Sequence, residues 1–170
     1  ELNGSSAGKS IFDRLSDGDE LFNPKDAPDL RGYVDMALTG GFPAAAIELS
    51  GSARENWLAS YVEGLVLHEV ELSPGAELGR QVDPDRVRRY FEAYALNTSG
   101  VVDHRQIYET ATVSKQAGET YERMLRRLMV VDHIPAWSSN RFRRLVKRPK
   151  RYVIDPSLVG AALALDTAGV

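Results

Sequence analysis

The sequence predicts a mainly α-helical chain, in which a small helical subdomain precedes a winged helix-turn-helix with a β-hairpin wing. Apolar residues recur at helical spacing through most of the chain. From residue 85 onward the predicted order is helix, helix, turn, helix and two strands, which is the order of a winged helix-turn-helix. The balance of charge also changes sign between the two halves, which indicates two segments with different partners.

The net charge of −3 conceals this asymmetry. Residues 1–85 hold 16 Asp and Glu against 6 Lys and Arg, a net charge of −10, whereas residues 86–170 hold 8 against 15, a net charge of +7. The chain has no cysteine, which excludes disulfides, thiol catalysis and cysteine-ligated zinc. Its longest apolar run, Leu158 to Leu165, is too short to span a bilayer, so we expect no membrane partner. The absence of cysteine suits a reducing cytoplasm, where we expect the protein to be located.

Residues 1–84, in the acidic half, are expected to form a helical region with an irregular start. Its expected elements are, in order, a loop with one brief helical turn over residues 1–30, a helix capped by Asp29 and ended by Gly40 and Gly41, a short helix from Ala44 to Leu49, a long amphipathic helix from Ser52 to about Leu72, and a linker from Ser73 to Pro84. Trp57, Leu58, Tyr61 and Leu65 form the apolar stripe of the long helix.

Residues 85–155, which lie almost entirely in the basic half, are expected to form the winged helix. Its expected elements are a helix from Asp85 to the Ser99-Gly100 stop, an extended piece at Val101 and Val102, a helix from His104 to Ala111, a helix capped by Ser114, and strands within Met129–Trp137 and Arg151–Ile154. Asp155 and Pro156 then supply an N-cap and a first-turn proline for a last helix. Because that helix is apolar almost all round, we expect residues 156–170 to lead into a further domain that covers it, and we interpret both chain ends as cut points in a longer protein.

The candidate binding residues are mostly cationic and lie in the third helix and the wing. They are Lys115, Gln116, Thr120, Arg123 and Arg127 on the helix, and Arg141, Arg143, Arg144, Lys147, Arg148 and Lys150 on the wing. Lysine and arginine neutralise phosphates, and a helix N-terminus adds its dipole, so these side chains predict a surface that follows a nucleic-acid backbone. A solvated basic face, or docking on an acidic protein surface, is the alternative interpretation.

Two stretches imitate catalytic motifs without meeting their spacing. Gly4 to Ser10 resembles a phosphate-binding loop but has three residues, not four, between its first glycine and Gly-Lys-Ser. His68-Glu69 begins like a zinc-protease motif, but Leu72 stands where the second histidine is needed. We therefore expect no catalytic residue, no metal site and no cofactor within these residues.

Several stretches resemble signatures of a prokaryotic family of AAA-type ATPases, in its C-terminal region of unknown function. Residues Gly40-Gly41-Phe42-Pro43, followed by Trp57-Leu58 and Tyr61, resemble its GGFP…WL..Y signature. Its second signature, RLVKSPKLYFLD, is similar to Arg144-Leu145-Val146-Lys147 with Pro149, Lys150, Tyr152 and Asp155. Between them, Leu125, Leu128 and Ile134-Pro135-Ala136-Trp137 resemble its LE..YLV..LPPW stretch, so that the resemblance covers residues 30–165.

The resemblance implies that this chain is the lid of an ATPase joined to a winged helix. ATP and Mg²⁺ would then bind an ATPase core upstream of these residues, and a nuclease-like domain often follows downstream. Many relatives carry an Arg-Asp pair where this chain has His68 and Glu69. Arg148 replaces a small polar residue, which makes this wing more basic than in those relatives, and Pro156 replaces a Thr or Ser.

Two functions remain open from the sequence. The first is a non-catalytic part of an AAA-type ATPase whose basic winged helix contacts duplex DNA with little sequence specificity. The second is a regulatory module whose basic surface docks on the ATPase core, on its acidic lid or on a partner protein. The ATPase core and the C-terminal domain of the same chain are its expected partners. An enzyme acting through this chain alone is the least favoured, because no group of residues meets the geometry of a catalytic site.

Overall fold

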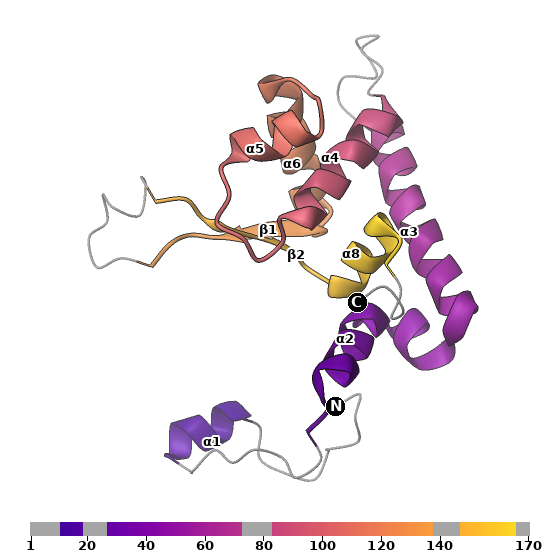
Figure 1. The fold of residues 1–170 in the computed structure, drawn as a ribbon, viewed down its shortest axis with the longest axis vertical. Helices are drawn as coiled ribbons and strands as arrows, with labels where there is room; N and C mark the ends of the chain where they lie inside the picture. The colour runs from indigo at the N-terminus through magenta and orange to yellow at the C-terminus, as the bar shows by residue number, and fades with distance from the viewer. Residues whose placement is uncertain (1–10, 19–26, 73–82, 138–146, 166–170) are drawn as a thin grey trace.

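The computed structural model describes residues 11–18, 27–72, 83–137 and 147–165, with the side chains of Ile11 and of residues 66–72 excepted. These residues are mainly helical, and they include one small antiparallel sheet of two strands (Figure 1). The elements are α1 (Ile11–Asp17), α2 (Leu30–Thr39), the π-helix η1 (Ala44–Glu48), α3 (Gly51–Leu72), α4 (Pro84–Leu96), α5 (His104–Thr110), α6 (Lys115–Arg127), β1 (Val131–Ile134), β2 (Lys150–Val153) and α8 (Pro156–Leu163).

Three helices begin where a capping side chain predicts that they should. Asp29 accepts a hydrogen bond from the Gly32 amide at 2.8 Å, and Ser114 accepts one from the Ala117 amide at 3.2 Å. The Asp155 carboxylate caps α8 in the same way. Each cap satisfies a first-turn amide that has no partner within its own helix, which is why the local sequence is enough to predict these boundaries.

The start of α4 differs from the prediction. Residues Asp83 and Pro84 were expected to close a linker, but Asp83 is the N-cap of α4 and Pro84 is its first residue. The Asp83 carboxylate accepts a hydrogen bond from the Asp85 amide at 3.0 Å. Proline fits the first turn because its missing N–H would be unpaired there in any case. The same Asp-Pro pair begins α8, so the rule applied to one helix also holds for the other.

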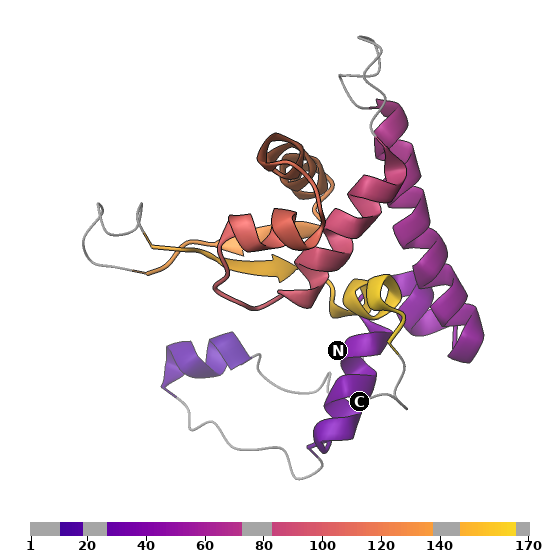
Figure 2. The ribbon, with the colours of Figure 1, turned by 45° about the horizontal axis from the view of Figure 1, so that its top comes forward.

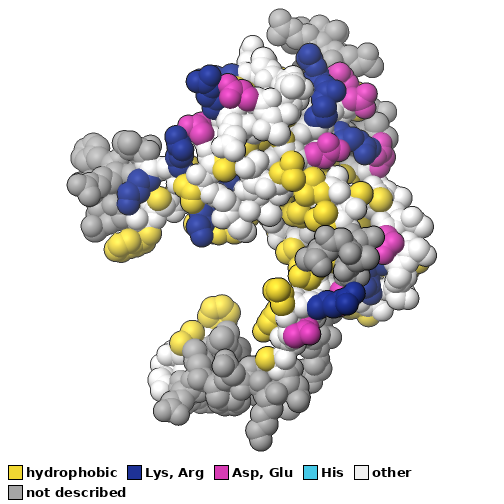
Figure 3. All heavy atoms as spheres, in the orientation of Figure 1, with side chains coloured by type: hydrophobic (Ala, Val, Ile, Leu, Met, Phe, Trp, Pro, Cys, Tyr) yellow, Lys and Arg dark blue, Asp and Glu magenta, His cyan; other side chains and the backbone are white. Residues whose placement is uncertain are grey.

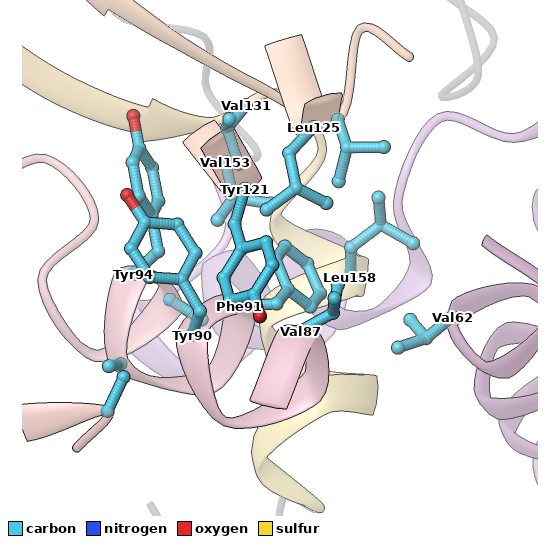
Figure 4. Packing of buried hydrophobic residues seen from close by; sticks show 14 of the residues in the cluster. Val62, Val87, Tyr90, Phe91, Tyr94, Tyr121, Leu125, Val131, Val153 and Leu158 are labelled. Atoms are coloured by element: carbon cyan, nitrogen blue, oxygen red, sulfur yellow. The ribbon is translucent and has the colours of Figure 1, made fainter. Parts of the chain in front are cut away.

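The core surrounds α4, which carries the largest fully buried side chains. Val87, Tyr90, Phe91 and Tyr94 are all at most 2% exposed. Figure 4 shows the rings of Tyr90, Phe91 and Tyr94 packed against side chains from the elements around α4. The other buried apolar contributors are Tyr121 and Leu125 of α6, Val131 and Val153 of the hairpin, Leu158 of α8 and Val62 of α3. One apolar cluster therefore includes residues from both the acidic and the basic half of the sequence.

The segment that joins α4 to α5 pairs with the edge of β2 that does not face β1. Val131 lies opposite Val153, and Ile134 lies opposite Lys150. The Ser99 amide donates to the Arg151 carbonyl at 2.7 Å, and the Arg151 amide donates to the Gly100 carbonyl at 3.1 Å. The residues that pair with β2 are thus Ser99 and Gly100, just before the extended piece expected at Val101 and Val102.

Helix α8 has packing partners within its own chain, while the expectation that residues 156–170 lead into a further domain stays a prediction. It packs against α2, α3 and α4 of its own chain (Figures 1 and 2). Leu158 and Gly160 are buried, and a Cβ at Gly160 would lie 2.6 Å from the Leu38 side chain of α2. The partners of this apolar helix come from far earlier in the sequence, so the local pattern could not reveal them.

The first signature stretch contacts the end of the second one in space. The Gly41 amide donates to Asp155 Oδ2 at 2.8 Å, while Asp155 Oδ1 accepts from the Ser157 amide and hydroxyl. Gly40 has φ +72°, and a Cβ there would lie 2.6 Å from Asp155 Oδ1. Only glycine fits both the backbone conformation and the close approach.

The aromatic residues of the first signature also pack on one another. Phe42 lies 5.7 Å from Trp57 and 4.8 Å from Tyr61, measured between ring centroids, and Trp57 stacks on Tyr61 at 5.4 Å. Arg54 then fastens the segment, donating to the Ala45 and Leu49 carbonyls at 2.8 and 2.7 Å. The aromatic signature residues, together with Arg54, thus hold the segment between α2 and α3 in place.

Candidate functional site

Helix α6 has one packed face and one exposed face. Tyr121 and Leu125 are buried in the core, whereas the five candidate residues of this helix lie on the other side. Lys115, Gln116, Arg123 and Arg127 are exposed, and Thr120 is half-buried. The exposed face carries three of the predicted cations and one carboxylate, Glu119, which lies 3.8 Å from Lys115. The structure therefore brings the predicted helix residues together on one surface.

Hydrogen bonds order part of this face. The Thr120 hydroxyl donates to the Gln116 carbonyl at 2.9 Å, and Arg123 Nη2 donates to the Thr120 hydroxyl at 3.2 Å. Arg123 is held along the helix by this contact, but its guanidinium still has free N–H groups for an anion. Arg127 lies one turn further on.

The angle between α5 and α6 depends on a close contact at Gly118. A Cβ at this position would lie 2.8 Å from the Tyr108 Cβ of α5 and 3.3 Å from the Tyr90 ring. Thr112, in the turn between the two helices, has φ +53°. A larger residue at Gly118 would push α6 outward, because the neighbouring atoms belong to packed side chains.

The hairpin carries the second group of predicted residues. Lys147, Arg148 and Lys150 are exposed on the approach to β2 and on its first residue. Arg141, Arg143 and Arg144 lie outside the described residues. In Figures 1 and 2 the hairpin projects away from α3 and α8, on the side of the molecule where α5 lies.

Arg148 connects the hairpin to the start of α5. Its guanidinium lies 3.1 Å from the carboxylate of Asp103, which also accepts a hydrogen bond from the Arg105 amide at 3.0 Å. The backbone hydrogen bond and, secondly, Arg148 hold the pKa of Asp103 below its usual range. Both partners are more than half exposed, so this ion pair positions the hairpin more than it stabilises the fold.

Arg151 belongs to the cationic run in the sequence, but it is not a surface residue. Only 7% of it is exposed, because it lies on the inward face of β2 with Val153 and makes a buried ion pair with Glu122 of α6. Its guanidinium also lies 6.0 Å from the Tyr94 ring centroid. Side chains alternate along a strand, so the apolar Val153 two residues later was the signal that Arg151 points inward.

Glu122 connects Arg151 to a half-buried histidine. Its second oxygen lies 3.4 Å from His104 Nε2, and the Tyr90 hydroxyl lies 2.8 Å from the same nitrogen. Burial lowers the pKa of His104, although the charge of Glu122 acts in the opposite direction. Burial, and then Glu122, raises the pKa of Tyr94 to about 12 and raises that of Tyr90 as well. Tyrosine is therefore neutral at both positions at physiological pH.

A cavity of about 530 Å³ lies between α2, α3 and α8. Asp35, Arg54 and Glu55 contribute polar atoms to it, while Leu38 and Leu58 contribute apolar surface. Sequence reasoning did not find it, because one wall is α8, which lies far later in the sequence than α2 and α3.

The side chains of the two stretches that imitate catalytic motifs are not among those the structure describes. Gly4 to Ser10 lies outside the described residues, and only the backbone of His68 and Glu69 is described, within α3. Among the described side chains, no group of three or more His, Asp or Glu residues is placed to hold a metal ion. No described helix is long and apolar enough to cross a membrane.

Comparison with known proteins places the chain in a family. A family model described as a domain of unknown function, DUF8612, matches residues 30–169. The chain belongs to this family. The DUF8612 match begins at the first residue of α2 and includes the Gly40-Gly41 turn, the α6 face and α8. No curated protein and no solved structure matched the chain.

Proposed function

We propose that this DUF8612 domain binds duplex DNA through the exposed face of α6 and the basic hairpin, with little sequence specificity. The observation that carries the proposal is the α6 face, where Lys115, Arg123 and Arg127 point away from the core beside a single carboxylate. Cations spaced along a helix suit phosphates spaced along a nucleic-acid backbone. Because these side chains are exposed, they do not contribute to the packed core.

The order of the elements supports a winged helix-turn-helix as the fold of residues 85–155. Helices α4, α5 and α6 are followed by the hairpin β1–β2, and the Ser99-Gly100 segment pairs with the free edge of β2. In winged helices the third helix enters the major groove and the hairpin contacts the backbone beside it. In this chain those two elements carry the predicted cations.

Weak sequence specificity follows from the kinds of side chain on the α6 face. Bidentate contacts to base edges are made by Arg, Asn and Gln near the start of a recognition helix. Gln116 is of this kind in the first turn of α6, and Arg123 and Arg127 lie two and three turns further on. Phosphate contacts would therefore provide most of the affinity.

Fluorescence anisotropy of the 170-residue chain with a labelled random-sequence duplex tests the proposal. If about four phosphates are neutralised, log K should fall with log salt with a slope near −3.6. The double variant Arg127→Ala/Lys150→Ala should reduce this slope by nearly 2 units, while Arg31→Ala/Arg88→Ala removes the same charge elsewhere and should bind almost as the wild type does. Flat anisotropy at low salt would refute the proposal.

Docking on protein is the second candidate, favoured by the opposite charges of the two halves of the sequence. One such contact already exists within the chain, where Arg88 of α4 forms an ion pair with Glu63 of α3. Under this hypothesis the basic surface binds an acidic partner, such as an ATPase core. Co-purification with that core, together with no binding to DNA, would favour docking over the first proposal.

We also propose that the chain belongs to an AAA-type ATPase, of which residues 30–84 would form part of the lid. The sequence signatures support this, and in the folded chain Gly40, Gly41 and Phe42 have defined contacts with Asp155, Trp57 and Tyr61. ATP hydrolysis by the longer protein, stimulated by duplex DNA, is the expected result. A longer protein that neither binds nor hydrolyses ATP would contradict this assignment.

A further inference from the structure

The end of the hairpin exposes apolar side chains. Trp137 is 81% exposed, the highest value among the large hydrophobic residues that the structure describes, and Ile134 is 58% exposed. Both lie outside the buried core cluster. Figure 3 shows hydrophobic side chains beside the loop of the projecting hairpin, with Lys and Arg side chains near them. An indole left in water at the end of a projecting element is a candidate contact for a partner.

Two exposed lysines lie on the arm of the hairpin opposite the one that carries Ile134 and Trp137. Ile134 lies opposite Lys150 in the register of the hairpin, and Lys147 is exposed three residues before Lys150. Neither lysine forms an ion pair within the described part of the chain. Within residues 147–150 the sequence has three cations, Lys147, Arg148 and Lys150, and no Asp or Glu. The partner that fits this position therefore combines negative charge with a flat apolar surface.

We propose that Trp137 stacks on an unpaired base, so that the preferred ligand is a duplex with a single-stranded extension. The inference rests on the proposed DNA binding and specifies its substrate. In a continuous duplex the base faces are covered by their neighbours, whereas an unpaired base offers a π-face to an aromatic ring. Lys147 and Lys150 would hold the phosphates on either side of that base.

A protein partner is less well matched to this surface. Tryptophan is also frequent at protein interfaces, but lysine is depleted from their buried centres. At the hairpin end the exposed indole is accompanied by Lys147 and Lys150. Nucleic acid satisfies these charges without burying them, because phosphates remain at the solvent edge of the bound strand.

The test compares a blunt duplex with the same duplex carrying a short single-stranded tail. We expect the wild type to bind the tailed duplex about tenfold more tightly, equal to ~1.4 kcal/mol, and Trp137→Ala to lose this preference while keeping its affinity for the blunt duplex. Trp137→Phe keeps an aromatic face and should retain most of the preference. Leu30→Ala removes a side chain of similar exposure, 80%, on α2 and serves as the control.

Tryptophan emission provides a second measurement. The tailed duplex should quench the wild type but not Trp137→Phe, in which Trp57 remains as the only tryptophan. Equal binding of both DNAs by the wild type, or an equal loss for both in Trp137→Ala, would overturn the inference while leaving duplex binding intact. If the wild type binds neither DNA, the proposed function fails first and the inference fails with it.

Discussion

The buried ion pair between Arg151 and Glu122 allows a quantitative prediction of stability. The side chains are only 8% and 14% exposed, so Arg151→Met would leave the Glu122 carboxylate buried beside Tyr90 and Tyr94 without its cation. Breaking a buried pair in this way typically costs about 3–5 kcal/mol, because one charge then remains uncompensated. At ~2–4 °C per kcal/mol for a chain of this size, Tm should fall by ~6–20 °C.

The assay is thermal and urea unfolding, followed by circular dichroism at pH 7. The double variant Glu122→Gln/Arg151→Met removes both charges and should be more stable than Arg151→Met alone. Arg148→Met is the matched control, because its pair with Asp103 is 60% and 51% exposed and should contribute less than about 1 kcal/mol. A loss below about 1 kcal/mol for Arg151→Met, or a double variant less stable than the single one, would refute the reasoning.

Three further predictions concern pH, the tight turn and the shared cap. Burial lowers the pKa of His104 in the folded state, so as the pH falls below the unfolded-state pKa of about 6.5 the unfolded chain takes up a proton first and the wild type loses stability. Between pH 7.5 and 5.5 the free energy of unfolding of His104→Gln should therefore fall less than that of the wild type, and equal losses would contradict this. Gly40→Ala should destabilise the fold by ~1–3 kcal/mol because of its positive φ, whereas Gly64→Ala, with open space around it, should stabilise α3 by ~0.5–1 kcal/mol in urea unfolding. Asp155→Ala should cost more than the ~1 kcal/mol expected for Asp29→Ala, since Asp155 also accepts from the Gly41 amide; equal Tm values for the two variants would contradict this.

Helix boundaries were the features that local sequence predicted best. The caps at Asp29, Ser114 and Asp155 depend on one side chain and an amide two or three residues later, so they need no knowledge of the fold. The prediction of a mainly helical chain with a small hairpin is confirmed. Asp83 was missed because its Asp-Pro pair was interpreted as a linker signal.

The long-range features could not be predicted in the same way. The covering of α8 depends on α2, which lies more than a hundred residues earlier. The ion pair of Arg151 depends on Glu122 of another element, toward which the alternation along β2 turns it. The exposed candidate residues on α6 were found from helical periodicity, since Tyr121 and Leu125 identify the face that is packed.

The contact between Gly41 and Asp155 also sets an order of events during protein synthesis. The hydrogen bond joins residues 114 positions apart, so α2 and its turn leave the ribosome long before their partner exists. At ordinary rates of translation this delay is about 6–23 seconds. Throughout that interval the apolar side chain of Leu38 has no α8 to pack against, and it is available to chaperones. The amino-terminal part of the fold is thus made first but completed last.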